Sequence, residues 1–461
     1  MDGRRSTTRA AAAAAEKRSR AAEFFDCDGA RRKRPMTRRQ AEVFSQCDQT
    51  VQDYEHNVVD VLPDEALLLV FARMASVDLL PLRLVCRRWD ELILTPAVWS
   101  RRRLCFPSMA LEDIGSSNAF QAAFVLYCAP AMDTVDLELD CSHKHRPITP
   151  ALLRGRCMVR ALRCSLTLKE ESADTLYDFF RRVQPSLQSL NVELNSSGLG
   201  VNAVLANVLG ILDGTPLTTL ALRCGRRSRF LLPAQDFQFR KLQSLQTLLV
   251  DDRVLALDLQ KGLVHLNQNS LRQVTCYPEL LPALAECPRL REVTVTASSS
   301  LRDLHKLTTL EALALRWTDP CQAEHIRDYF DGVDAVEGFK LPSEMHLIVA
   351  DWYISPAVLT GIGKGLSKFT TLTYVRGLGP AGNLDFISPM DSLINFRVRA
   401  YSINNSWADL RSSSLRKIEL LDPGHKTEAW QRWLMAKLPA MEITIRKSRP
   451  AFLRGFGYNE L

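Results

Sequence analysis

Several features that decide a protein's class are missing from this sequence. No run of about 18 or more apolar residues occurs, so no segment has the length of a membrane-spanning helix. The N-terminus lacks the apolar core of a secretory signal, and we therefore expect an intracellular protein. The 461 residues are 46% hydrophobic and 24% charged, which predicts that most of the chain folds, either as two or more domains or as one extended repeat array.

Closely spaced cysteine pairs are missing as well. The 12 cysteines are scattered singly along the chain, and no C-x-x-C pair occurs among them. In a chain without a secretory signal, this pattern favours free thiols in a reducing compartment, mostly buried as small apolar side chains. A disulfide scaffold is not expected at this length.

The sequence has little that indicates catalysis, a metal or a cofactor. It contains no G-x-S-x-G, H-E-x-x-H or EF-hand pattern. Cys141, His143 and His145 are close together, but a structural zinc site needs more ligands, so we expect a solvated turn there. The stretch "GIGKG" at 361–365 lacks the spacing of a phosphate-binding loop and is interpreted as a flexible turn. We expect no metal, cofactor or catalytic residue, although a Cys/His hydrolase stays open because such groups meet only in the fold.

The excess of positive charge is confined to the N-terminal arm. Of the chain's 59 basic and 52 acidic residues, 12 and 5 lie within residues 1–40, which leaves 47 of each sign elsewhere. A neutral body does not suit a nucleic-acid-binding protein. We expect residues 1–56 to form a disordered basic arm, in a protein of the nucleus, the cytoplasm or both. The cluster with the density of a nuclear localisation signal is Arg31, Arg32, Lys33 and Arg34. A solvated tail without that role and a mitochondrial transit peptide are the alternatives.

Three short helices are predicted within residues 57–106. The first begins near Pro63, the second is expected to be capped by Asp78, and the third opens at Pro96. In each helix the apolar side chains recur with helical spacing on one face. These faces comprise Leu67, Val70, Phe71 and Met74, then Leu82, Val85, Cys86 and Trp89, then Val98 and Trp99. So small a unit has more apolar positions than its own core can bury, which predicts a partner for the surplus.

The stretch LPDEALLLVFARMASVDLLPLRLVCRRWDELILTPAVW, residues 62–99, resembles an F-box from end to end. The matching positions are Leu62-Pro63, Glu65, Leu67-Leu68, Phe71, Asp78-Leu79, Leu84-Val85-Cys86, Trp89, Leu92 and Val98-Trp99. The resemblance implies docking to a Skp-type adaptor and, through it, to the cullin and RING subunits of a ubiquitin ligase. It implies that the residues that meet the adaptor or shape that surface are Leu62, Pro63, Leu67, Leu68, Phe71, Val85 and Trp89.

After a linker helix expected within residues 107–130, one pattern recurs through residues 131–446. An apolar-x-x-apolar-x-apolar motif returns at steps of about 20–30 residues, and each copy has the period-2 alternation of a short strand. The copies are MDTVDLEL, VRALRCSL, LQSLNVEL, LTTLALRC, LQTLLVDD, LRQVTCYP, LREVTVTA, LEALALRW, INFRVRAY and LRKIELLD, and MHLIVADW and LTYVRGLG are further candidate strands. Helix-like segments such as ADTLYDFFRRV and VNAVLANVLGIL lie between them.

This pattern resembles the leucine-rich repeat, in which each repeat contributes one strand to a solenoid. Such repeats usually carry Asn or Cys at the turn after the strand, and here Asn195 fits while most copies depart from the rule. The alternative is an ordinary α/β domain with a parallel sheet. The predicted fold class is α/β, with a small all-α F-box domain, a leucine-rich-repeat solenoid of alternating strands and helices, and a C-terminal extension at 447–461.

These expectations combine into a substrate-recognition subunit of a Skp–cullin–F-box ubiquitin ligase, without catalysis of its own. The repeats would bind a protein substrate, and a membrane or nucleic acid is not an expected partner. Candidate substrate contacts, chosen as exposed strand residues, are Arg223, Asp251, Arg316, Trp317 and Arg399. The alternative is a protein-interaction scaffold that uses the F-box outside ubiquitin transfer, and an enzyme in its own right has the least support.

Overall fold

The computed structural model describes part of the chain. The described residues are 62–76, 78–105, 125–140, 155, 157–167, 173–194, 201–224, 232–233, 237–251, 254–317, 323–333, 342–349, 365–376, 387, 390–399, 414–421 and 427–446. The predicted basic arm with its localisation signal, the predicted C-terminal extension, and Cys141, His143 and His145 lie outside these residues.

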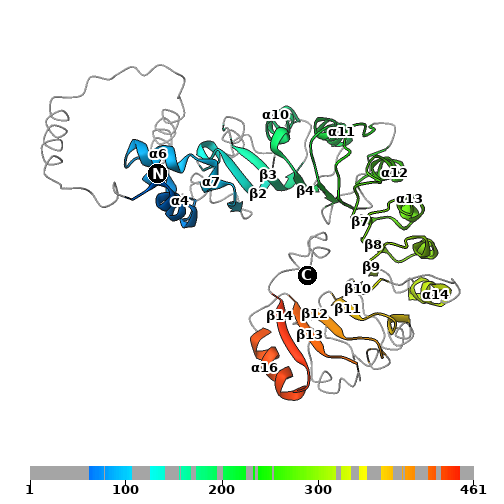
Figure 1. Ribbon diagram of the computed structural model, residues 1–461. Coiled ribbons are helices and arrows are strands. Elements are labelled where there is room, and N and C mark those ends of the chain that lie inside the picture. The colour runs from blue at the N-terminus through cyan, green and yellow to red at the C-terminus, as the bar shows by residue number, and fades with distance from the viewer. Residues whose placement is uncertain are drawn as a thin grey trace, which may run out of the picture. The chain divides into compact units, whose positions relative to one another are not determined.

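Among the described residues, four short helices precede the sheet (Figure 1). They are α4 (Asp64–Arg73), α5 (Leu79–Leu82), α6 (Arg87–Ile93) and α7 (Pro96–Trp99). The second helix predicted from the sequence is therefore two helices, because Cys86 has the extended backbone of a new helix start, with φ −157° and ψ 166°. Asp78 holds the position before α5, but its side chain makes no capping hydrogen bond.

The rest of the described chain forms one sheet of fourteen parallel strands, in which spatial order follows chain order from β1 to β14. The strands are β1 (Arg103–Cys105), β2 (Ala131–Asp140), β3 (Met158–Thr167), β4 (Ser189–Leu194), β5 (Thr219–Cys224), β6 (Thr247–Val250), β7 (Gln273–Cys276), β8 (Glu292–Thr296), β9 (Ala312–Trp317), β10 (Glu344–Val349), β11 (Thr371–Arg376), β12 (Asn395–Arg399), β13 (Lys417–Leu421) and β14 (Glu442–Arg446). Each of the twelve motifs quoted from the sequence overlaps one of these strands, whereas β1 and β14 were not predicted.

Helices connect the strands and cover one face of the sheet (Figure 1). They are α10 (Ala173–Val183), α11 (Val201–Leu212), α12 (Leu257–Leu266), α13 (Leu281–Leu284), α14 (Ala323–Val333) and α16 (Thr427–Lys437), with 3-10 turns η3 (Gln184–Ser186), η4 (Pro278–Leu280) and η5 (Ser299–Lys306). Parallel crossovers are right-handed, so connections that always step toward the next strand place every helix on the same side. The segments predicted to be helical at 173–183 and 201–212 are α10 and α11.

The two faces of the sheet differ in chemistry. In β4, Leu190, Val192 and Leu194 are buried toward the helices and alternate with half-exposed polar side chains. We call the face opposite the helices the open face. By alternation and strand register it carries Thr134, Asp136, Ala161, Arg163, Ser165, Ser189, Asn191, Glu193, Thr219, Ala221, Arg223, Thr247, Leu249, Gln273, Thr275, Glu292, Thr294, Thr296, Ala312, Ala314, Arg316, Glu344, His346, Thr371, Thr373, Asn395, Arg397, Lys417, Glu419, Glu442 and Thr444.

Hydroxyl groups tie several successive strand motifs together, and the Asn267 amide adds bonds from the Leu245 N–H (2.9 Å) and to the Leu242 carbonyl (2.8 Å). A Ser or Thr just before the motif's first apolar residue donates to a carbonyl at, or directly before, the start of the preceding motif. The bonds are Ser186 to Val159 (3.1 Å), Ser244 to Leu217 (2.7 Å), Ser270 to Leu245 (2.7 Å), Thr309 to Leu290 (2.7 Å) and Ser414 to Leu393 (2.8 Å). Asn195 lies outside the described residues.

Arg102 fixes the end of the helical region. Its guanidinium donates to the carbonyls of Phe71 and Met74, at 2.5 and 2.6 Å, and its Nε donates to the carbonyl of Val98 at 2.7 Å. The guanidinium also lies over the Trp99 ring, 5.3 Å from the centroid. One side chain therefore joins the end of α4 to the end of α7.

We expect Arg102→Lys to loosen this junction. Lysine keeps the charge but has a single nitrogen, so at most one of the three bonded carbonyls keeps an equally good donor. Amides in the last turn of α4 should then exchange with solvent deuterium about tenfold faster, because a hydrogen bond to a charged group contributes roughly 1.5–3 kcal/mol. Hydrogen–deuterium exchange with mass spectrometry measures this. Arg101→Lys, at the exposed neighbouring position, is the control, and equal exchange in both variants would contradict the role given to Arg102.

Gly365, the last glycine of "GIGKG", is required by close packing. A Cβ at this position would overlap the Phe330 side chain of α14. Phe330 is itself buried and packs edge-on against Phe369, with ring centroids 6.0 Å apart, so it has little room to move. Packing explains this glycine without a phosphate.

Gly365→Ala should therefore destabilise the protein by about 1–3 kcal/mol, through overpacking of the core. The control is Gly262→Ala in α12, where no heavy atom lies within 4 Å of the new Cβ. That change should be neutral or stabilise by up to about 1 kcal/mol, because alanine is the better helix former. Urea unfolding midpoints compare the two, and a similar loss in both variants would refute the packing argument.

Candidate functional site

Helix α4 exposes aliphatic side chains as well as burying them. It begins directly after Pro63, whose carbonyl accepts a hydrogen bond from the Leu67 N–H at 3.2 Å. Leu67 and Phe71, one turn apart, are buried. Leu69 and Val70 are 65% and 50% exposed, although the helical spacing had placed Val70 on the buried face. The helix thus offers apolar surface beyond what its own core uses.

The turn between α5 and α6 shows the same feature more strongly. Leu84 is 87% exposed and Val85 is 60% exposed. Two backbone bonds hold the turn, from Leu84 N–H to the Pro81 carbonyl at 3.1 Å and from Val85 N–H to the Leu82 carbonyl at 3.2 Å. Two large aliphatic side chains are therefore held in water by an ordered turn, an arrangement typical of a surface that another protein covers.

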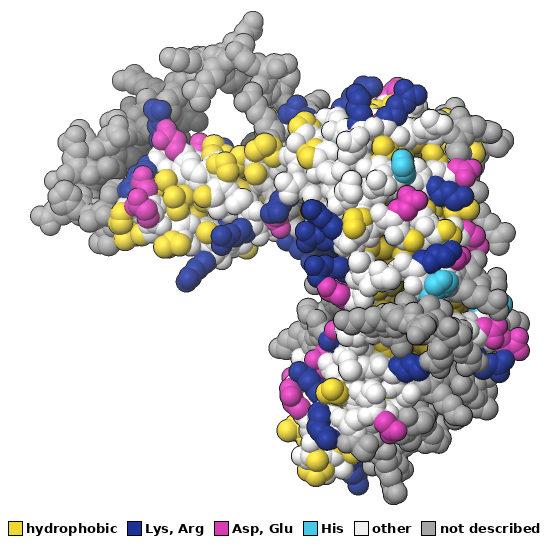
Figure 2. Space-filling view, turned by 45° about the vertical axis from the view of Figure 1, so that its right-hand side comes forward, with side chains coloured by type: hydrophobic (Ala, Val, Ile, Leu, Met, Phe, Trp, Pro, Cys, Tyr) yellow, Lys and Arg dark blue, Asp and Glu magenta, His cyan; other side chains and the backbone are white. Residues whose placement is uncertain are grey.

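Contacts on both sides of this turn keep it in place. Arg83 forms an ion pair with Asp90 of α6, with Nε 2.6 Å from the carboxylate oxygen. Trp89 of α6 packs edge-on against Phe71 of α4, with ring centroids 5.3 Å apart. Figure 2 shows hydrophobic side chains gathered at the surface of these helices. The exposed groups thus stand on a packed support, as a docking surface requires.

The residues predicted to bind the adaptor fall into three kinds by exposure. Leu62, Pro63 and Val85 are exposed, Leu68 and Trp89 are half-buried, and Leu67 and Phe71 are buried. The last two can only shape a docking surface from beneath. Leu69, Val70 and Leu84 were not among the candidates, yet they are more exposed than Leu62. The available signal for Leu84 was its place beside Val85, outside the apolar face expected for the second helix.

The candidate substrate contacts Arg223 and Asp251 lie at neighbouring places of the sheet, at and just beyond the ends of β5 and β6. Arg223 is on the open face, half-buried, with the charges of Glu193 and Asp251 beside it. Burial lowers the pKa of Arg223 to about 10, while those two carboxylates act in the opposite direction. The guanidinium is therefore charged at neutral pH and already faces opposite charge within the protein.

The other three candidates are placed mainly by their backbones. Arg316 is half-buried on the open face of β9 and pairs with Ile348 in register. The backbones of Trp317 and Arg399 pair with Val349 and Leu421 in the sheet, and the side chains of both lie outside the described set. The five candidates therefore come from strands spread over β5 to β12.

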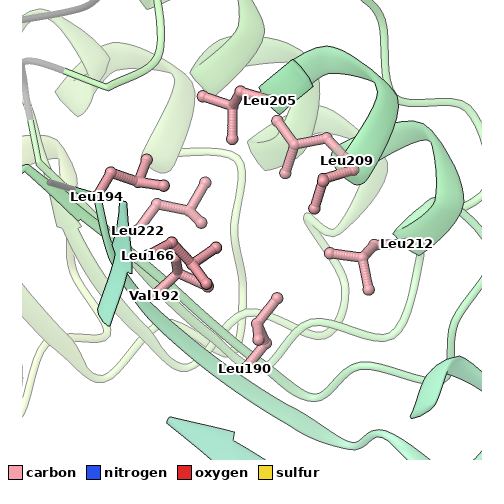
Figure 3. A pocket seen from close by; sticks show the side chains of 9 residues that line it. Leu166, Leu190, Val192, Leu194, Leu205, Leu209, Leu212 and Leu222 are labelled. Carbon is pink, nitrogen blue, oxygen red and sulfur yellow. The ribbon is translucent and has the colours of Figure 1, made fainter. Parts of the chain in front are cut away.

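A small cavity between the sheet and α11 is lined only by aliphatic side chains (Figure 3). Leu166, Leu190, Val192, Leu194 and Leu222 from the strands converge there with Leu205, Val208, Leu209 and Leu212 from α11. Its volume of about 10 Å³ is near the room that one water needs, and it has no polar partner for a water. It is a packing gap of the core.

The buried cysteines Cys157 and Cys287 do not have the character of nucleophiles. Five of the seven free thiols among the described side chains are buried, and Cys86 is exposed. Burial raises the pKa of Cys157 to about 12 and that of Cys287 to about 11, so both stay protonated at neutral pH. A reactive thiol needs the opposite shift.

Within the part of the chain that the structure describes, no three His, Cys, Asp or Glu side chains come together in a way that would hold a metal ion. None of the described helices combines the length and the apolar character needed to cross a membrane.

Comparison with known protein families identifies a domain in the region of the four short helices. No significant match is found among curated proteins. The model of the F-box-like family matches residues 59–105, a range that contains α4 to α7 and β1. The chain therefore contains an F-box-like domain, a kind of domain that supports protein–protein interaction.

Proposed function

We propose that this chain is the substrate-recognition subunit of a Skp–cullin–F-box ubiquitin ligase, in which the F-box-like domain binds the Skp-type adaptor. F-box domains generally bind such adaptors. The observation that carries the proposal is the ordered turn with Leu84 and Val85, 87% and 60% exposed, within that domain. Burying such side chains against a partner contributes roughly 1.5–3 kcal/mol each, so they are the natural anchors of the contact.

In this proposal the sheet is a leucine-rich-repeat solenoid that binds a protein substrate. Strictly sequential strand order supports it, because a doubly wound sheet reverses its strand order at a switch point. The helices cover a single face, which leaves the other, polar face for recognition. The hydroxyl ties between successive motifs also repeat with the motif, as expected when each unit contacts only its neighbours.

The chain itself would carry out no chemistry. Its contribution would be to hold a substrate near a ubiquitin-charged enzyme, so that transfer is favoured by proximity and orientation. Proximity is effective only if the docking surface and the recognition surface are rigidly connected. The bonds from Arg102 to the carbonyls of α4 and α7, directly before β1, supply such a connection.

Charging the exposed turn tests the adaptor contact. The double variant Leu84→Asp/Val85→Asp of the full chain should bind a purified Skp-type adaptor at least about a hundredfold more weakly, since two aliphatic anchors are lost and two carboxylates are desolvated. Calorimetry or a quantitative pull-down measures the change. Both side chains are exposed, so the variant should keep the thermal stability of the native chain.

A matched control is Met435→Asp, which charges an equally exposed apolar side chain on α16 and should bind the adaptor normally. Unchanged binding by the turn variant would overturn the assigned surface. Capture of a cullin together with the adaptor is the result expected of a ligase subunit. Adaptor binding without any cullin would instead support the scaffold that works outside ubiquitin transfer.

A further inference from the structure

Five open-face positions on β8 to β12 form a row that is rich in acceptors. In register, Glu292 pairs with Ala312, Ala312 with Glu344, Glu344 with Thr371, and Thr371 with Asn395. We call these five residues the acceptor row. With strands about 4.8 Å apart, the row is roughly 19 Å long, a length that about six residues of an extended peptide would span.

The acidic end of the row lacks a cation on one side. Glu292 and Glu344 flank the small Ala312, and the carboxylate of Glu292 makes no ion pair or hydrogen bond within the described part of the chain. Burial raises the pKa of Glu292, and the negative charges of Glu344 and Glu311 raise it further. The carboxylates of Glu292 and Glu344 therefore lie on either side of the small Ala312 side chain, and no described positive charge lies between them.

Arg397 is an example of a cation bound by carboxylates on the open face. Arg397 on β12 reaches across β11 to Glu344, with Nη1 2.9 Å from the carboxylate, and its Nε is 2.9 Å from Glu419 on β13. The side chains of Arg397 and Glu419 are largely buried in this arrangement. Glu344 is thus neutralised from the β12 side, and the Nε2 of His346 on its own strand lies 3.7 Å from the same carboxylate. Its β8 side, toward Glu292, has no cationic group among the described residues.

Two hydrogen-bonding groups at the other end of the row provide independent evidence. Thr373 is fully buried, and its hydroxyl has no hydrogen-bond partner among the described residues. It lies on the open face, between His346 and Arg397 in register. The Oδ1 of Asn395 is also buried and has no partner in the part of the chain that the structure describes. Buried polar atoms are normally satisfied, so two unsatisfied groups beside one row indicate that donors from another molecule belong there.

We propose that the acceptor row binds a basic, extended segment of a partner protein, with a lysine or arginine side chain over Ala312 between Glu292 and Glu344. Donors further along the segment bind Asn395 and Thr373. The inference rests on the proposed function, and it assigns a chemistry to the substrate segment. A cation there relieves the repulsion between the two carboxylates, and an acidic segment or a nucleic acid would increase it.

The test uses the purified full-length chain and a display library of random linear peptides as the probe. Peptides selected on the native chain should share a lysine or arginine. Each is then measured by fluorescence anisotropy against native protein and Glu292→Gln, and again with its basic residue replaced by glutamine. Either change should weaken binding about tenfold, and both together should weaken it little further, because they remove the same interaction.

Two further variants sharpen the outcome. Glu286→Gln, at an exposed position outside the row, should leave binding unchanged. Glu292→Lys should reverse the preference and favour peptides with glutamate at the basic position. The proposal is overturned if selected peptides share no basic residue, if Glu292→Gln binds them normally, or if no peptide is enriched above background. Adaptor binding by Leu84→Asp/Val85→Asp is measured separately, so failure here leaves the docking result standing and the reverse also holds.

Discussion

The rest of the structure depends on the three carbonyl bonds of the Arg102 guanidinium. Helix ends leave carbonyl groups without partners, and α4 ends at Phe71 to Met74 in a region with few other donors. A planar fork of N–H groups reaches two of these carbonyls and a third from α7 at once, which a single ammonium group does not. Without this tie, the four short helices would have too small a core to keep a fixed position.

The same residue also starts the sheet. The Arg102 carbonyl accepts hydrogen bonds from Asp133 and Thr134 N–H groups, at 3.1 and 3.2 Å. The same arrangement recurs along the chain: the N–H groups of two consecutive residues at the start of a strand donate to one carbonyl of the preceding strand segment. The accepting carbonyls are those of Gln188, Thr218, Gln246, Arg272, Arg291, Thr370 and Ile394. This repeated contact fixes the register between neighbouring strands at several places along the sheet.

Most strands of the sheet, and helices α10 and α11, were predictable from the sequence. Alternating apolar residues identify a strand locally, so every quoted motif proved to be one, and α10 and α11 ended where their spacing did. β1 was missed because a strand as short as Arg103–Cys105 gives no period to read. β14, Glu442–Arg446, has the same alternation as the quoted motifs and was predictable. Sequence reasoning looked for asparagines after the strands, while the ties come from hydroxyls such as Ser244 and Ser270 before them. A Ser-Leu pair at the start of several motifs was the signal.

The exposure of Leu84 could not be predicted from residue spacing, because it depends on where α5 ends.

Charge on the open face is arranged differently in its two halves, and this difference bears on recognition. Toward β1 the charges are mutually paired, with Asp136 between Arg103 and Arg163, and Arg223 between Glu193 and Asp251. A charged ligand would have to break such a pair before it gained one, so little net binding energy remains there. From β8 onward Arg397 neutralises Glu344 from one side only, and Glu292 has no cation within the described residues. A ligand cation gains there without displacing an existing partner. In the proposed function, complementary charge would therefore discriminate between partners most strongly in the second half of the sheet.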